Sequence, residues 1–122
     1  MIKNHNSNFD RCLTHGEIME DRLCSIFAEK RIEIKSDNLW HKTGNIAVEY
    51  FCWGKKSGIS ISKAKFWAFI LEKEKSIEWV FIVHIKKLRH LAQKYYDKGS
   101  VKYGGDAKCS WMILIPVKEL IQ

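Results

Sequence analysis

The stretch "EWVFIVHI", Glu78 to Ile85, decides the fold class, because it is a nearly continuous apolar run of strand length. Such a run is typical of a central strand that is buried on both faces of its sheet. Helical and strand patterns alternate on both sides of it. We therefore expect an α/β protein, formed by residues 1–122 as a small single domain with one mixed central sheet flanked by helices.

The neighbouring segments predict the order helix, strand, strand, helix, strand, helix, strand. Each segment is recognised by the spacing of its apolar residues and by the residues that favour caps and turns at its ends. We expect helices over residues 8–27, 62–71 and 86–99, strands over residues 31–36, 45–53, 78–85 and 111–117, and loops over residues 37–44, 54–58 and 102–110. The crowded aromatic residues between 62 and 71 also leave a strand open there.

Charge and composition narrow the class of partner. The chain of 122 residues has a net charge of +7 and a pI near 9.3, which favours a polyanion such as nucleic acid, or an acidic membrane surface, over a small neutral ligand. Its apolar runs fall short of the roughly 20 residues of a membrane span. No signal peptide opens the chain, so we expect a cytoplasmic protein whose four cysteines are reduced.

The stretch "RIEIKSD", Arg31 to Asp37, alternates as a half-buried strand does. Its isoleucines point one way, and Glu33, Lys35 and Asp37 point the other. We assume that this strand forms an antiparallel hairpin with "NIAVEYFCW", residues 45–53, so that the isoleucines of both strands face the core. Glu33 then lies opposite Glu49, with the Cβ atoms about 4.5–5.5 Å apart.

Two carboxylates placed side by side repel each other unless a cation lies between them. Glu20 is the carboxylate of the first helix that turns most toward its apolar stripe, so it is a third candidate ligand. Mg²⁺ prefers such oxygen ligands, and a neighbouring lysine can stabilise charge that develops on a phosphodiester. The alternative is an exposed strand face whose charges pair with one another.

Several motifs together resemble the PD-(D/E)XK nuclease superfamily, particularly its small phage-encoded members. Glu33-Ile34-Lys35 is similar to the E-x-K signature on a strand, preceded by a helix that carries a glutamate. The run "GEIMED…RIEIKSDNLWHKTGNIAVEY…GKKSGISISKAKFW…KYGGD" is also similar to uncharacterised phage proteins. The resemblance extends from about Gly16 to Pro116.

The resemblance implies a restriction-endonuclease-like fold and a Mg²⁺-dependent DNA endonuclease in which Mn²⁺ can substitute. It further implies a homodimer that acts on branched DNA such as Holliday junctions. Glu33 would be a metal ligand and Lys35 the active-site lysine, with Glu20, or else Glu17, as the helix glutamate. The usual first aspartate is missing, so either Asp21, or Asp37 or Glu49 in a rearranged site, would supply that carboxylate.

Basic residues outside this strand are candidates for contacts with DNA phosphates, which give affinity without sequence specificity. They are Lys55, Lys56, Lys63, Lys86, Lys87 and Arg89. Two alternatives to the nuclease are a non-catalytic nucleic-acid-binding protein on the same fold and a basic protein–protein adaptor. A pure binder has little use for acidic groups near phosphates, so convergence of the carboxylates around Lys35 is the feature that separates the first two hypotheses.

Overall fold

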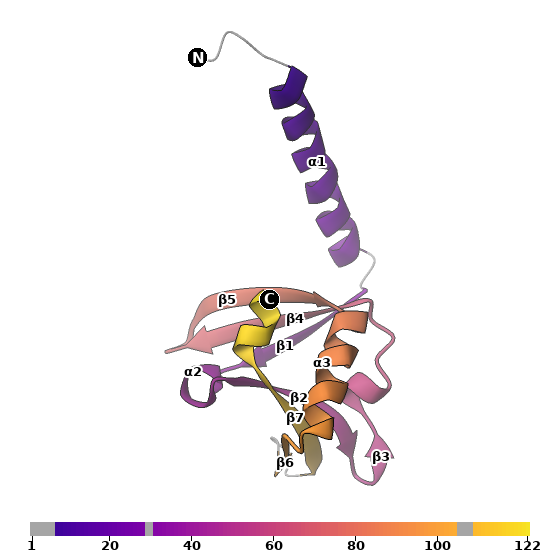
Figure 1. Ribbon diagram of the computed structural model, residues 1–122, viewed down its shortest axis with the longest axis vertical. Coiled ribbons are helices and arrows are strands. Elements are labelled where there is room, and N and C mark those ends of the chain that lie inside the picture. The colour runs from indigo at the N-terminus through magenta and orange to yellow at the C-terminus, as the bar shows by residue number, and fades with distance from the viewer. Residues whose placement is uncertain (1–6, 29–30, 105–108) are drawn as a thin grey trace. The chain divides into compact units, whose positions relative to one another are not determined.

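The computed structural model describes residues 7–28, 31–104 and 109–122, and the side chains of residues 7–13 lie outside this description. The chain divides into two compact units, residues 1–31 and residues 32–122. The first unit contains helix α1, Ser7–Ala28, and the second contains the strands and the hydrophobic core (Figure 1).

Helix α1 closely matches the helix predicted over residues 8–27. Three residues of its apolar stripe, Met19, Leu23 and Phe27, are 43–47% exposed. Three further residues of that stripe, Phe9, Cys12 and Leu13, lie outside the described side chains. No helix within the described residues is both long and apolar enough to cross a membrane.

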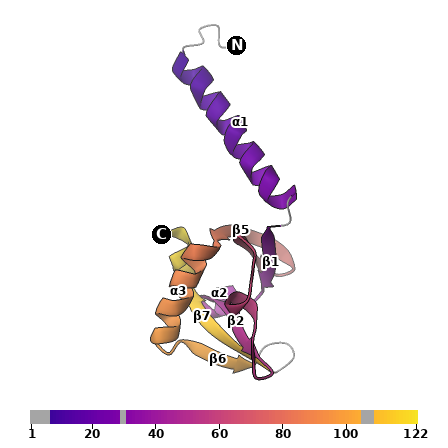
Figure 2. The same cartoon turned by 90° about the vertical axis from the view of Figure 1, so that its right-hand side faces the viewer.

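The second unit has two sheets in place of the single central sheet that we expected (Figures 1 and 2). In the mixed sheet, β1 (Ile32–Asp37) pairs in parallel with β4 (Phe66–Lys73), and β4 pairs antiparallel with β5 (Ser76–His84). The antiparallel sheet has the order β3-β2-β7-β6, from β3 (Lys55–Lys56), β2 (Asn45–Cys52), β7 (Ser110–Pro116) and β6 (Val101–Gly104). The protein is therefore a small α/β fold, as predicted.

Two helices and two 3₁₀ turns complete this unit. They are α2 (Trp40–Thr43), α3 (Ile85–Asp97), η1 (Gly58–Ser60) and η2 (Val117–Ile121). Helix α3 confirms the helix predicted over residues 86–99. It begins at the cap His84, whose Nδ1 accepts a hydrogen bond from the Lys86 amide, 3.1 Å away.

The helix predicted over residues 62–71 is wrong, and the strand that its crowded aromatic residues left open is observed instead, as β4 from Phe66. Trp67, Phe69 and Leu71 are buried at a spacing of two residues, which is the period of a strand. The short helix α2 and strand β6 also occur where loops were expected. The strand predicted over residues 78–85 is confirmed as β5, but it is an edge strand, and Val80 is 52% exposed.

The core lies between the inner faces of the two sheets and helix α3. Its largest fully buried side chains are Ile46, Val48, Trp67, Phe69, Leu71, Leu88 and Ile115. Leu88 comes from α3, and the others come from β2, β4 and β7. At about 1.5–3 kcal/mol for each large apolar side chain removed from water, this cluster supplies most of the drive to fold.

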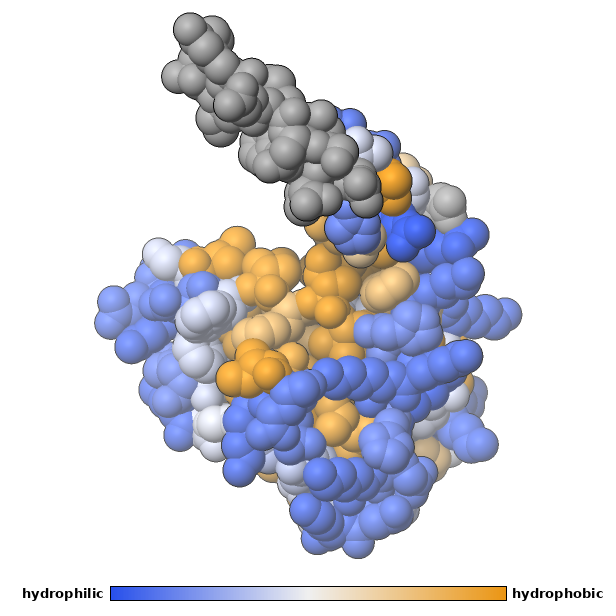
Figure 3. All heavy atoms as spheres, turned by 45° about the horizontal axis from the view of Figure 1, so that its top comes forward, coloured by the Kyte–Doolittle hydropathy of each residue, from blue (hydrophilic) through white to orange (hydrophobic). Residues whose placement is uncertain are grey.

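Strand β1 presents the opposite face to the one we expected. Glu33 pairs with Trp67 and Lys35 pairs with Phe69, so these charged residues share the face of the sheet that carries the core. Ile34 pairs with Ala68 on the other face and is 55% exposed. On the side of the molecule seen in Figure 3, hydrophobic residues gather near the centre and hydrophilic residues surround them.

Candidate active site

Glu33 and Lys35 form an ion pair on β1, which is an edge strand. The Lys35 Nζ atom lies 3.3 Å from Glu33 Oε1, and the two side chains are 49% and 33% exposed. They are two residues apart on one strand and therefore leave the same face. The same ammonium lies 5.7 Å from the centroid of the Trp67 ring, a cation–π contact that helps to hold it beside the carboxylate.

Ser62 holds the second oxygen of this glutamate. Its hydroxyl donates a hydrogen bond of 2.8 Å to Glu33 Oε2 and accepts one of 3.1 Å from the Trp67 indole nitrogen. The Ser62 carbonyl accepts a 2.7 Å hydrogen bond from the guanidinium of Arg89 on α3. These bonds connect β1, the segment before β4 and helix α3 at one place.

The Glu33 carboxylate retains hydrogen-bonding capacity in this arrangement. A carboxylate offers about four lone-pair positions, whereas Lys35 and Ser62 account for one contact on each oxygen. Both side chains of the ion pair are partly open to solvent, so an additional cation or donor has a route to the carboxylate. Glu33 is thus oriented by the protein while it still has positions for a ligand.

Asp37 has a structural partner at the end of the same strand. Its Oδ1 atom accepts hydrogen bonds from the backbone amides of Leu39 and Trp40, at 2.7 and 3.0 Å. Those amides begin α2, so the carboxylate caps the first turn of this short helix. The Trp40 indole nitrogen donates to the Glu72 carbonyl at 2.7 Å and anchors α2 to β4.

Glu49 lies in the other sheet, so the predicted pairing of Glu33 with Glu49 is wrong. It pairs with Met112 on β7, and its Oε1 atom accepts a short hydrogen bond from the Ser110 hydroxyl. The assumed hairpin fails because α2 and Gly44, which has a left-handed backbone, turn the chain between β1 and β2. Each strand then pairs with a strand that is distant in the sequence.

Glu20, the fourth predicted carboxylate ligand, is an exposed residue of α1 in the separate unit formed by residues 1–31. Glu17 and Asp21, the alternatives, are exposed on the same helix. Among the residues that the structure describes, no group of three or more His, Cys, Asp and Glu side chains lies close enough to hold a metal ion. Within residues 32–122, the observed cluster contains Glu33 and Lys35 without Asp37 or Glu49.

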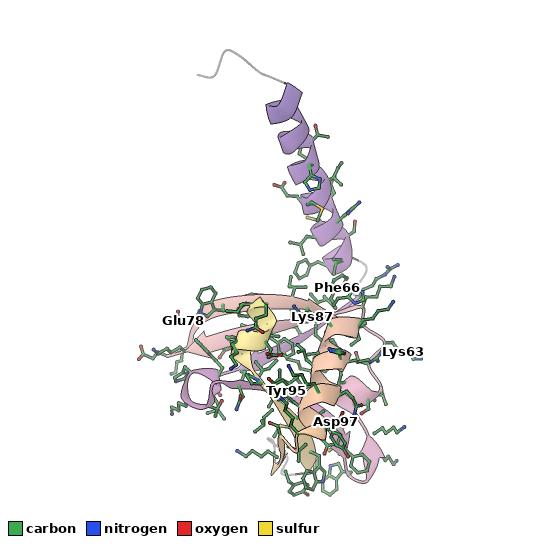
Figure 4. All side chains as sticks on the ribbon, in the orientation of Figure 1. Lys63, Phe66, Glu78, Lys87, Tyr95 and Asp97 are labelled. Atoms are coloured by element: carbon green, nitrogen blue, oxygen red, sulfur yellow. The ribbon has the colours of Figure 1, made fainter. Side chains whose placement is uncertain are left out.

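The predicted DNA-binding residues are all exposed. Lys55 and Lys56 form β3, and Lys86, Lys87 and Arg89 lie on α3. Arg89 donates to the Ser62 carbonyl, and Lys63 directly follows Ser62 in the chain, so both are linked to the segment that holds Glu33. Figure 4 shows Lys63 projecting from the side of the domain. The Lys87 ammonium instead donates to the carbonyl of Gln122 at 2.7 Å.

Two residues of this cluster were not identified from the sequence. The sequence pattern places Ser62 at the start of the helix predicted over residues 62–71, and Trp67 among the crowded aromatic residues of that stretch. The alternation of Trp67, Phe69 and Leu71 was the available signal for a strand, and it would have placed Ser62 in the segment before that strand.

Comparison of the chain with protein-family models, with curated proteins and with solved structures found no match.

Proposed function

We propose that the protein is a metal-dependent DNA endonuclease whose active site is centred on Glu33 and Lys35. The observation that carries this proposal is the orientation of the Glu33 carboxylate among basic residues. Lys35 pairs with the carboxylate, and Arg89 donates to the carbonyl of Ser62, whose hydroxyl binds the same carboxylate. A carboxylate opposes the approach of a phosphate unless a cation intervenes. A glutamate among basic residues is therefore typical of a site that binds a divalent ion together with a phosphate.

Mg²⁺ suits one or two protein carboxylates, because it retains waters and takes its other ligands from substrate phosphates. Glu33 fits this role through its remaining lone pairs and its place beside the Lys35 ammonium, whereas the contacts of Asp37 and Glu49 are with backbone amides and with a serine hydroxyl. When bound, the ion would acidify an attacking water and neutralise charge on the phosphate. Glu33 is the residue that would hold it.

The protein side chains divide the remaining tasks. Lys35 would place its ammonium beside the phosphate oxygens on which charge develops in the transition state. Ser62 fixes the orientation of Glu33 through its hydroxyl. Arg89 and Lys63 would bind phosphates on the flanking backbone, which orients the strand without reading its bases. Branched DNA as the preferred substrate, and a homodimer as the active form, are the parts of the proposal suggested by the resemblance alone.

A second candidate is a nucleic-acid-binding protein without catalysis. It is favoured by the placement of Glu33 and Glu49 in different sheets and by the capping role of Asp37. In that case Lys35 only neutralises the charge of Glu33, and Ser62 only donates a hydrogen bond to it. The basic surface would still bind phosphates, with an affinity that falls steeply as salt rises.

A combined binding and cleavage assay separates the two candidates. Labelled linear duplex, single-stranded DNA and four-way junctions are incubated with the protein in Mg²⁺, Mn²⁺ or EDTA. We expect cleavage that requires the metal and is fastest on the junction. Arg89→Ala should weaken binding several-fold and lower the slope of log affinity against log salt by about one. Salt-dependent binding without cleavage in either metal would establish the second candidate instead.

A further inference from the structure

Cys52 and Cys109 bring two sulfur atoms together at one end of the antiparallel sheet. Cys52 ends β2, and it pairs with Ser110, the residue that follows Cys109 in the chain. The two Sγ atoms are 2.7 Å apart, although 57 positions separate the cysteines in the sequence. Non-bonded carbon atoms already pack at about 3.5–4.0 Å. The sulfurs are therefore closer than ordinary packing of two thiols allows.

The two thiols differ in their access to solvent. Cys109 is 4% exposed, and Cys52 is partly exposed. The hydrogen bond with Cys52, followed by burial, raises the pKa of the Cys109 thiol above its ordinary value. A reagent from solution therefore reaches Cys52 first, and Cys109 is in place to react afterwards.

We propose that Cys52 and Cys109 form a reversible disulfide by exchange with a small-molecule disulfide such as oxidised glutathione. The Cys52 thiolate attacks one sulfur of this reagent and releases one small thiolate, leaving a mixed disulfide on Cys52. Cys109 then loses its proton, attacks the Cys52 sulfur and releases the second small thiolate. In total, two protein thiols are oxidised to one disulfide, and the reagent is reduced to two thiols that take up the two protons.

The disulfide would join the last residue of β2 to the residue before β7, next to Ser110, which binds Glu49. Ser110 follows Cys109 and donates its hydroxyl to Glu49, and the Cys109 sulfur is within 4.0 Å of that hydroxyl. Closing a long chain segment also restricts the unfolded state, which raises stability. Oxidation is thus expected to make the antiparallel sheet harder to unfold without involving the Glu33–Lys35 pair.

The test uses the full chain in buffers with increasing ratios of oxidised to reduced glutathione. Intact mass and peptide mapping should show the loss of two hydrogen atoms and a single cross-link between Cys52 and Cys109. The melting temperature should rise by about 10 °C or more and return after dithiothreitol is added. Cys24→Ser, which removes an exposed thiol, should leave the cross-link and the shift intact.

Cys52→Ser and Cys109→Ser should each abolish the cross-link and the stability shift. Far-ultraviolet circular dichroism of the reduced variants tests whether they fold. If a variant does not fold, the peptide map of the chain without substitutions shows whether the Cys52–Cys109 cross-link forms. Glutathione retained as a mixed disulfide at Cys52, or cross-links that use Cys24 in place of either residue, would overturn the proposal. So would an oxidised chain that melts at the temperature of the reduced chain.

Discussion

Glu33 and Glu49 each accept a hydrogen bond from a serine, but they lie in different sheets and in different chemical surroundings. Glu33 has Lys35 at 3.3 Å and Arg89 bonded to the carbonyl of its serine. Glu49 has two thiols beside its serine. The same carboxylate–serine contact therefore has a lysine beside it in one place and thiols beside it in the other.

The difference shows that the surrounding charge, more than the residue type, decides what a carboxylate can do. The partly exposed Glu33 carboxylate is counterbalanced by the Lys35 ammonium, and basic residues nearby attract polyanions. The Glu49 carboxylate is held instead by a serine hydroxyl that lies next to the Cys109 thiol.

The largest expected effect comes from removing the ammonium beside Glu33. Lys35→Met should lower the single-turnover rate of junction cleavage by about 100-fold or more, because a charge that stabilises the transition state is lost. Lys73→Met, at the far end of β4 in the same sheet, is the matched control. It removes one exposed lysine and should leave the rate nearly unchanged. Equal losses in both variants would point to general charge and not to Lys35.

The second prediction concerns the backbone that packs against Glu49. Gly58 has φ of +52°, and a methyl group there would overlap the Glu49 carbonyl oxygen. Gly54 has a similar positive φ of +73° but open space around it. Gly54→Ala should therefore cost about 1 kcal/mol of unfolding free energy through backbone strain alone. Gly58→Ala should cost about 2 kcal/mol more, because overlap is added to strain.

Urea denaturation of the two alanine variants measures this difference directly. Similar unfolding midpoints for both would mean that η1 moves away from β2 at little cost. The backbone packed around Glu49 would then be less rigid than the structure indicates.

The two serines should differ in what they contribute to stability. Ser62→Ala leaves the indole N–H of buried Trp67 without its acceptor, which should cost about 1–3 kcal/mol. Ser110→Ala removes one hydrogen bond to a partly exposed carboxylate and should cost about 1 kcal/mol. Thermal unfolding followed by circular dichroism compares them. A larger loss for Ser110→Ala would reverse the ranking.

Some features of β1 can be predicted from the sequence, and others cannot. Alternation predicts the strand over residues 31–36, which is observed as β1, and the Glu33–Lys35 contact follows from residues two apart on one strand. The alternation does not say which face meets the core. That is decided by parallel pairing with β4, whose residues are remote in the sequence and were expected to form a helix.

The contacts that distinguish Glu33 from Glu49 are also long-range. Ser62, Arg89 and Ser110 reach their partners only after two sheets and a helix have packed together. A single sequence contains no periodic signal for such contacts. Local features were predicted more successfully, as the helix over residues 86–99 shows, because its caps and apolar stripe lie within one segment.

The smallest expected effect belongs to Asp37, which tests whether a carboxylate on β1 is structural. Asp37→Ala should cost about 1 kcal/mol, because the first turn of α2 loses its cap. Asp37→Asn retains a side-chain oxygen that caps almost equally well, and it removes the charge. We expect the asparagine variant to match the original protein in both melting temperature and cleavage rate. A stable but inactive Asp37→Asn protein would instead assign Asp37 to the active site.

The most direct test of the central claim compares the two glutamates in single-turnover cleavage of a four-way junction in Mg²⁺. The variants are Glu33→Gln and Glu49→Gln, each confirmed as folded by its melting curve. We expect a loss of at least about 100-fold for Glu33→Gln and nearly the original rate for Glu49→Gln. A Glu33→Gln protein that cuts at the original rate, or a Glu49→Gln protein that loses as much activity as Glu33→Gln, would contradict it.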